Sequence, residues 1–109
     1  MQSWLYLLAA SATEVVMAYA LKQSDSWSRP LPSIVGVTAA LLSIFLLTHA
    51  MRGLPLGTAY VVWTGLGAVG VVLVGVLVLG EALTPVRMLL LAMVVAGTAG
   101  LRATGGAQP

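Results

Sequence analysis

Four long apolar runs, separated by short polar segments, organise the chain. The runs cover residues 4–21, 33–51, 58–79 and 85–101, and the segments KQSDSWSRPLP, RGLPLG and GEALTP between them contain turn-forming Gly and Pro residues. At 1.5 Å per residue, the first run forms a helix of roughly 27 Å, which just crosses the hydrocarbon core of a bilayer. The pattern predicts an all-α membrane protein, with one domain of four transmembrane helices over residues 1–109 and a flexible tail at 103–109.

Composition supports this prediction. Hydrophobic residues make up 60% of the chain and charged residues 7%, and the mean hydropathy is +1.03. These fractions differ strongly from those of soluble domains. The first run has no basic residue before it and contains Glu14, so we expect a retained helix rather than a signal peptide. The net charge of +2 is small and the basic residues are scattered, so no nucleic-acid partner is expected.

The charges flanking the runs give almost no preference for orientation. If the helices alternate in direction, Arg52 and Arg102 share the N-terminal side, whereas Lys22, Arg29 and Arg87 lie on the other. Two residues against three is a very weak bias under the positive-inside rule. Either the sequence inserts in both orientations, or a translocon or partner selects one.

Glu14 lies near the middle of the first run. A carboxyl at the centre of a membrane helix costs roughly 2.5–3.5 kcal/mol on insertion scales, so such a group is a candidate functional residue. A structural carboxyl satisfied by a hydroxyl or a partner helix is the alternative. Helical spacing places several small residues beside Glu14, and the predicted pocket-lining residues are Leu7, Ala10, Ser11, Met17 and Ala18, with Leu21 on the same face. The opposite face, with Leu5, Ala9, Val16 and Tyr19, suits lipid.

The third run carries two aromatic residues and several glycines. Tyr60 and Trp63 are three residues apart, and Gly67 and Gly70 continue the same face, with Gly67 also predicted to line the pocket. These aromatics are candidates for stacking on a planar cation or for hydrogen bonding a carboxyl, and Gly65 and Gly67 are a candidate helix kink. Alternatively, Tyr60 belongs to an interfacial aromatic belt and the glycines mark close helix packing.

The second and fourth runs add a hydroxyl and an assembly pattern. Ser43 is either a residue that orients a carboxylate or a serine bonded to its own backbone. Small residues recur along the fourth run, and they predict a dimerisation face rather than a lipid-facing one, at Ala92, Ala96, Gly97 and Gly100. Four short helices enclose little space. We therefore expect a second subunit, which brings two Glu14 carboxyls into one chamber.

The sequence resembles the small multidrug resistance transporters along nearly its whole length. The resemblance is carried by the first-run glutamate in ATEVVMAYALK, the PLPS that precedes the second run, the long segment LPLGTAYVVWTGLGAVG, and GTAGLR near the end of the fourth run. It implies a four-helix protein of the bacterial cytoplasmic membrane that works as an antiparallel, dual-topology dimer. It also implies proton-coupled export of small cations.

The same resemblance implies roles for individual residues. Glu14 matches the glutamate that alternately binds protons and substrate, Tyr60 and Trp63 match the binding-site aromatics, and Ser43 matches a hydroxyl near the glutamate in guanidinium-exporting members. The third-run segment resembles that subgroup. Met17 departs from it, because the subgroup has tryptophan at this position. A flexible thioether favours a roomier, greasier pocket for substituted guanidinium or other hydrophobic cations, so quaternary-ammonium export is an alternative.

Other functions and assembly states are alternatives to this one. A homodimer is expected, and one subunit of a heteromeric pair is the alternative. A cation or proton channel would use the same acid without obligatory exchange, and an accessory subunit would tolerate loss of Glu14. An enzyme is not expected, because the chain lacks a nucleophile, metal-ligand or phosphate-loop arrangement. With no cysteine present, neither a thiolate metal site nor a disulfide can form, and no cofactor is expected.

Overall fold

The computed structural model describes residues 2–105, which form four α-helices: α1 (Gln2–Gln23), α2 (Pro30–Ala50), α3 (Leu56–Leu77) and α4 (Pro85–Gly105). Each predicted run lies on one helix, and all four helices are long and apolar enough to cross a membrane. The prediction of an all-α chain with four helices capable of spanning a membrane is therefore confirmed. Residues 103–105 of the predicted tail continue α4, and the remainder of that tail lies outside the described residues.

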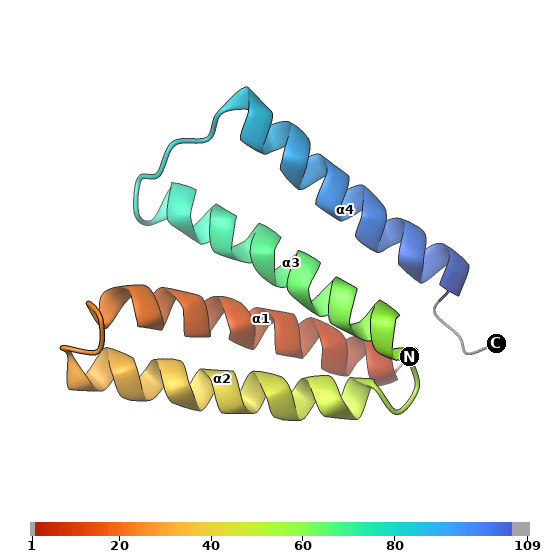
Figure 1. The fold of residues 1–109 in the computed structure, drawn as a ribbon, viewed down its shortest axis with the longest axis horizontal. Helices are drawn as coiled ribbons and strands as arrows, with labels where there is room; N and C mark the ends of the chain where they lie inside the picture. The colour runs from red at the N-terminus through yellow and green to blue at the C-terminus, as the bar shows by residue number, and fades with distance from the viewer. Residues whose placement is uncertain (1, 106–109) are drawn as a thin grey trace.

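The helices lie side by side in the order α2, α1, α3, α4 (Figure 1). Helix α1 packs against both α2 and α3, and the backbone of α4 lies close to that of α3 only, among the described helices. The chain measures 46 × 34 × 17 Å, so it is a shallow layer rather than a closed bundle. A layer of this shape leaves most apolar side chains exposed, as suits a protein surrounded by lipid.

Small residues let α1 approach its neighbours closely. A Cβ atom at Gly36 of α2 would lie 2.7 Å from Leu21 Cδ2, and one at Gly70 of α3 would lie 2.5 Å from Val15 Cγ2. Both distances are shorter than van der Waals contact allows, so a side chain at either position would force Leu21 or Val15 to shift. The predicted small stripe of α2 is buried accordingly, at Gly36, Ala39, Ser43, Leu47 and Ala50. The predicted lipid face of α1 is exposed, with Leu5 58% and Val16 50% accessible.

The apolar core gathers near one end of the layer. Its buried members come from α1, the end of α2, the α2–α3 loop and the start of α3: Leu7, Ala10, Leu47, Ala50, Leu54, Ala59 and Val62. Arg102 of α4 stacks over the ring of Trp4 on α1, 5.2 Å from its centroid, and joins the outermost helix to this core. The end of the layer that holds the N-terminus is therefore closed by packing.

The opposite end is formed by the α1–α2 and α3–α4 loops. Asp25, Ser26 and Trp27 have φ angles of 49°, 59° and 71°, and the buried Ser24 supports this turn by accepting a hydrogen bond from the Trp27 N–H at 3.2 Å. After α3, Gly80 adopts a φ of 72°, which glycine reaches without steric cost. This reversal lets the Glu81 N–H donate to the Gly75 carbonyl at 2.9 Å.

Helix α4 is the least buried element. None of the residues in its apolar window is buried, and its predicted dimerisation residues Ala92, Ala96, Gly97 and Gly100 are exposed. It meets α3 where Val94 and Thr98 lie against Gly65. One chain therefore leaves most of the surface of α4 uncovered by protein.

Candidate functional site

The carboxyl of Glu14 lies directly against Gly67 of α3. A Cβ atom at Gly67 would overlap Oε1 and Cδ of Glu14 and would lie 3.0 Å from Oε2, so any side chain at this position would occupy the place of the carboxyl. The sequence predicted that both residues belong to one site, and the structure brings them together. The absence of a side chain at Gly67 makes room for the Glu14 carboxyl. Helix α3 remains helical throughout Leu56–Leu77.

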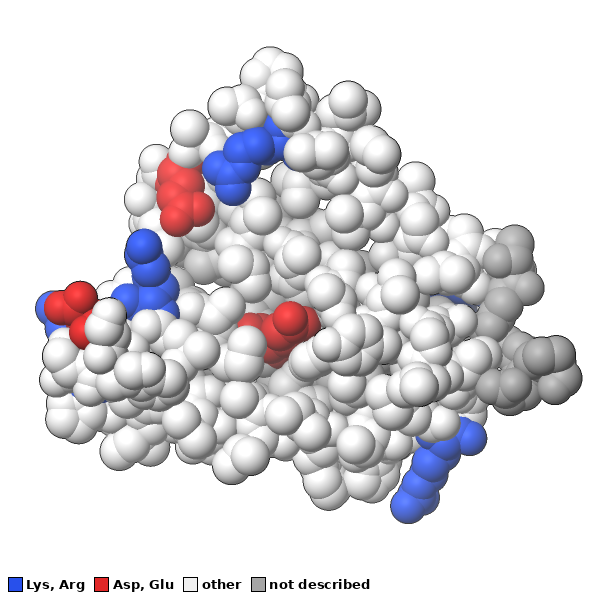
Figure 2. Space-filling view, in the orientation of Figure 1, with Lys and Arg blue, Asp and Glu red and all other residues white. Residues whose placement is uncertain are grey.

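The Glu14 carboxyl has an unsatisfied atom. Oε1 is buried and has no hydrogen-bond partner. Such atoms are rare, because an unpartnered buried polar atom costs free energy, and each calls for an explanation. In Figure 2 the other charges gather towards the helix ends, whereas one acidic patch lies midway along an uncharged surface. The structure thus shows a carboxyl held in apolar surroundings with a free acceptor.

Ser43 links three helices. Its hydroxyl donates to the Ala10 carbonyl of α1 at 2.7 Å and accepts a hydrogen bond from the Trp63 indole N–H of α3 at 2.9 Å. The bond to its own backbone that was considered as an alternative is not present. Because Ser43 is 1% exposed, these two bonds satisfy a buried hydroxyl and fix the indole ring beside α1.

The aromatic pair predicted on α3 is formed. The rings of Tyr60 and Trp63 lie 5.5 Å apart between centroids with an interplanar angle of 59°. Trp63 is partly buried against the core, whereas Tyr60 is 53% exposed. Tyr60 therefore presents an aromatic surface on a face that this chain leaves open.

The residues predicted to line a pocket around Glu14 divide into two groups. Leu7 and Ala10 belong to the packed core, and Ser11 is buried with its hydroxyl donated to the Leu7 carbonyl at 3.1 Å. Met17 and Ala18, on the other side of Glu14 along α1, are only partly buried. The face around Glu14 is thus closed towards the N-terminus and more open towards the α1–α2 loop.

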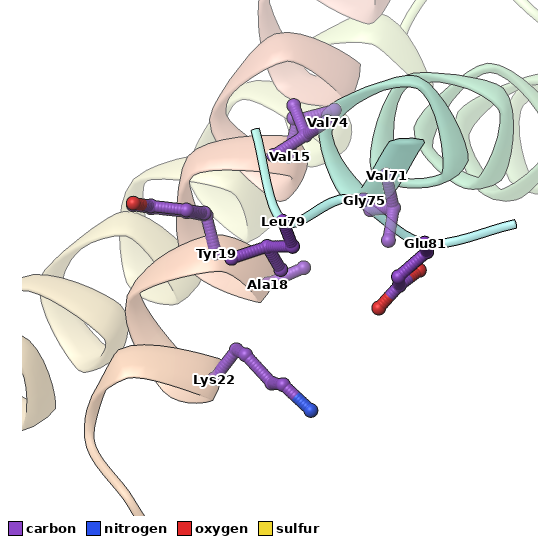
Figure 3. Close-up of a pocket in the computed structure, with 9 residues that line it drawn as sticks. All are labelled: Val15, Ala18, Tyr19, Lys22, Val71, Val74, Gly75, Leu79 and Glu81. Carbon is purple, nitrogen blue, oxygen red and sulfur yellow. The ribbon is translucent and has the colours of Figure 1, made fainter. Parts of the chain in front are cut away.

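A cavity that the sequence did not indicate lies on that open side. It has a volume of about 180 Å³ and is bounded by α1, the second half of α3 and the α3–α4 loop (Figure 3). Lys22 and Glu81 stand at its rim. The apolar pattern gives no reason to single out Glu81, and the neighbouring Gly80 is the residue that permits the turn that returns it to α3.

Within residues 2–105, no three His, Asp or Glu side chains lie together in a way that could hold a metal ion. The acidic groups are instead separate carboxyls: Glu14 within α1, Asp25 in the α1–α2 loop and Glu81 in the α3–α4 loop. Chemically, this arrangement offers single carboxylates to monovalent cations or protons.

Comparison with known proteins places this geometry in context. The family described as "Small Multidrug Resistance protein" matches residues 2–94. Relatives named "Guanidinium exporter" from Salmonella typhimurium (strain LT2) and Citrobacter freundii are each 50% identical over 100 residues, covering 92% of this chain and 95% of the relative. One of the same name from Escherichia coli O6:H1 is 48% identical over the same shares.

Replacing Ser43 with alanine is expected to destabilise the chain by about 1–3 kcal/mol, because the buried Trp63 indole N–H loses its acceptor. Unfolding of the purified protein in detergent, followed by circular dichroism, measures the change. Ser33→Ala is the matched control: Ser33 is only partly buried at the start of the same helix, and its hydroxyl donates to the Arg29 carbonyl. Equal stability losses for the two variants would contradict this assignment.

Replacing Gly67 with alanine is expected to push the Glu14 carboxyl out of its buried seat. Labelling of Glu14 by a hydrophobic carbodiimide, measured by mass spectrometry, should then become faster than in the parent chain. Gly57→Ala serves as the control, because a Cβ at Gly57 meets nothing within 4 Å. An unchanged labelling rate in Gly67→Ala would show that Gly67 does not set the position of the carboxyl.

Proposed function

Because the chain belongs to the small multidrug resistance family, we propose that it is a proton-coupled antiporter that exports guanidinium and substituted guanidinium cations across the bacterial cytoplasmic membrane. The observation that carries this proposal is the Glu14 carboxyl, whose buried Oε1 has no partner. The relatives named as guanidinium exporters support the choice of cation, and their bacterial sources support the choice of membrane.

The chemistry of a carboxylate suits this class of cation. Guanidinium is planar and presents paired N–H donors, which match the two oxygens of a carboxylate in a bidentate arrangement. Tyr60 and Trp63 add aromatic surfaces on the neighbouring helix, and such surfaces attract cations. Ser43 acts in this proposal by holding the Trp63 ring in place.

Exchange follows if proton and cation compete for Glu14. An apolar environment disfavours an unpaired charge, so the empty carboxyl favours the protonated, neutral form until a cation stabilises the anion. If access changes only when one of the two is bound, inward proton flow drives outward cation flow. Bending at Gly65 and Gly67 of α3 would accommodate part of that change, as proposed from the sequence.

The working unit in this proposal is an antiparallel homodimer. One chain is a shallow layer that encloses no chamber around Glu14, and α4 leaves most of its surface uncovered. A second copy seated along Ala92 and Ala96 would cover α4 and bring two Glu14 carboxyls together. The weak charge bias of the sequence is compatible with insertion in both orientations, and a non-identical partner subunit is the alternative.

Met17 supports a second candidate function within the same family. It lies one turn from Glu14 on the same face of α1 and is partly buried. Its flexible thioether can adapt to different shapes, which favours bulkier hydrophobic cations such as quaternary ammonium ions. These ions lack N–H donors and would bind through charge and aromatic contact.

Replacing Glu14 with glutamine is expected to abolish exchange, because the amide can neither take up a proton nor pair with a cation. The protein is reconstituted in liposomes with a trapped pH-sensitive dye, and a guanidinium gradient drives proton movement. Glu14→Asp keeps the carboxyl and should keep exchange at a reduced rate. Undiminished exchange in Glu14→Gln would refute the mechanism, and proton flux without a guanidinium gradient would indicate a channel.

Replacing Met17 with tryptophan is expected to narrow specificity. The ratio of tetraalkylammonium to guanidinium transport should fall by about tenfold or more, since steric changes of this kind in a pocket cost about 1–3 kcal/mol. A panel of guanidinium, alkylated guanidinium and tetraalkylammonium ions in the same liposomes measures the ratio. Met17→Leu conserves volume and should leave it unchanged. An identical ratio in the tryptophan variant would show that residue 17 does not select the substrate.

A further inference from the structure

The cavity on the open side of Glu14 combines apolar walls with a charged rim. Val15 and Ala18 of α1 face Val71 of α3 across it, and Lys22 and Glu81 stand at its mouth. Figure 3 shows Lys22 reaching from α1 and Glu81 from the α3–α4 loop, with their charged ends pointing into the same opening. The volume of about 180 Å³ compares with roughly 30 Å³ for each water in the liquid, so a small organic cation has room here.

This cavity lies next to Glu14 along both helices. Val15 is the next residue of α1 after Glu14 and Ala18 lies one turn beyond, while on α3 Val71 lies one turn beyond Gly67. In the other direction, Leu7, Ala10 and Val62 close the space by core packing. Along α1 and α3, the side of Glu14 towards the N-terminus is therefore packed, whereas the side that carries Lys22 and Glu81 contains a cavity.

Glu81 is held in the same manner as Glu14. A Cβ atom at Gly75 would overlap the Glu81 carboxyl, just as one at Gly67 would overlap that of Glu14. The turn at Gly80 and the bond from the Glu81 N–H to the Gly75 carbonyl fix the backbone in this position. Two glycines of α3, about two turns apart, therefore make room for two carboxyls: Gly67 for that of Glu14, and Gly75 for that of Glu81 at the mouth of the cavity.

The described charged side chains around Glu81 form no ion pair with its carboxylate, which can therefore accept a cation. Arg87, on the following helix, donates through its guanidinium to the Ala82 carbonyl at 2.6 Å. Lys22, across the mouth, uses its backbone carbonyl to accept a hydrogen bond from the Asp25 N–H, and its ammonium forms no ion pair with a described carboxylate. Asp25 and Arg29 belong to the α1–α2 loop and do not line the cavity.

We propose that Glu81, at the mouth of this cavity, is an outer binding site for small guanidinium-type cations on their way to Glu14. Lys22 competes with the cation for the Glu81 carboxylate. The class of cation rests on the function proposed above. A carboxylate supplies the bidentate acceptor that the guanidinium group requires, and the valine walls suit short alkyl substituents. With no cation bound, the Lys22 ammonium is the positive charge that can move across the mouth to Glu81.

Binding is tested without transport, on the full chain in bicelles with isotope-labelled glycine. Methylguanidinium is titrated into the Glu14→Gln variant, which lacks the inner carboxylate, and the amide signal of Gly75 is followed. A saturable shift at Gly75 is expected, and Glu81→Gln in the same background should weaken it at least tenfold. Lys22→Gln should tighten binding about two- to fivefold, because it removes a competing cation whose attraction to Glu81 is that of an exposed ion pair.

Asp25→Asn is the matched control, because it removes a carboxylate from the same end of the layer but not from the cavity. It should leave the Gly75 response unchanged. The proposal is overturned if Gly75 does not respond, if its response survives Glu81→Gln, or if Lys22→Gln weakens binding. That last result would indicate a site for an anion such as a lipid phosphate.

A transport measurement separates this proposal from the proposed function. In liposomes, Glu81→Gln should raise the KM for methylguanidinium and leave the maximal rate unchanged, whereas Asp25→Asn should change neither. If Glu14→Gln abolishes exchange but Glu81→Gln leaves KM unchanged, the antiport mechanism stands and the outer site is refuted. If Gly75 responds but the parent chain shows no exchange, the outer site stands and the antiport function fails.

Discussion

The contact between the Glu14 carboxyl and the bare backbone of Gly67 is the constraint on which the site depends. The partly buried carboxyl fits between α1 and α3 because α3 has a glycine, and so no side chain, at this position. The same contact leaves Oε1 without a partner inside the chain. The position of the carboxyl between α1 and α3 and the lack of a partner for its Oε1 are therefore both features of this one contact.

The two ends of the layer differ in how they are closed. Near the N-terminus, leucine, alanine and valine side chains fill the space between three helices, and Ser43 ties them together through hydrogen bonds to Ala10 and Trp63. Near the α3–α4 loop, the helices separate around a cavity with Lys22 and Glu81 at its rim. The two ends of the layer therefore differ in chemistry: one is an apolar core and the other is a cavity with charged side chains.

Much of this architecture could be predicted from the sequence, because helices in a membrane follow directly from hydropathy and helical spacing. The face around Glu14 and the buried stripe of α2 at Gly36 and Ser43 are examples. The partners of Ser43 could not be predicted, since spacing places a hydroxyl on a face but does not show which backbone it reaches. Glu81 was missed because its position depends on a loop that turns back at Gly80.

The seat at Gly67 has a consequence for how this protein can evolve. Every replacement of Gly67 adds at least a β-carbon, which would overlap the Glu14 carboxyl. Even the smallest substitution at residue 67 would therefore displace that carboxyl. On α1, by contrast, Met17 is only partly buried and already carries a side chain, so a change there does not begin from a bare backbone. New cation preferences should therefore arise by changes on α1, while α3 keeps the acid in place.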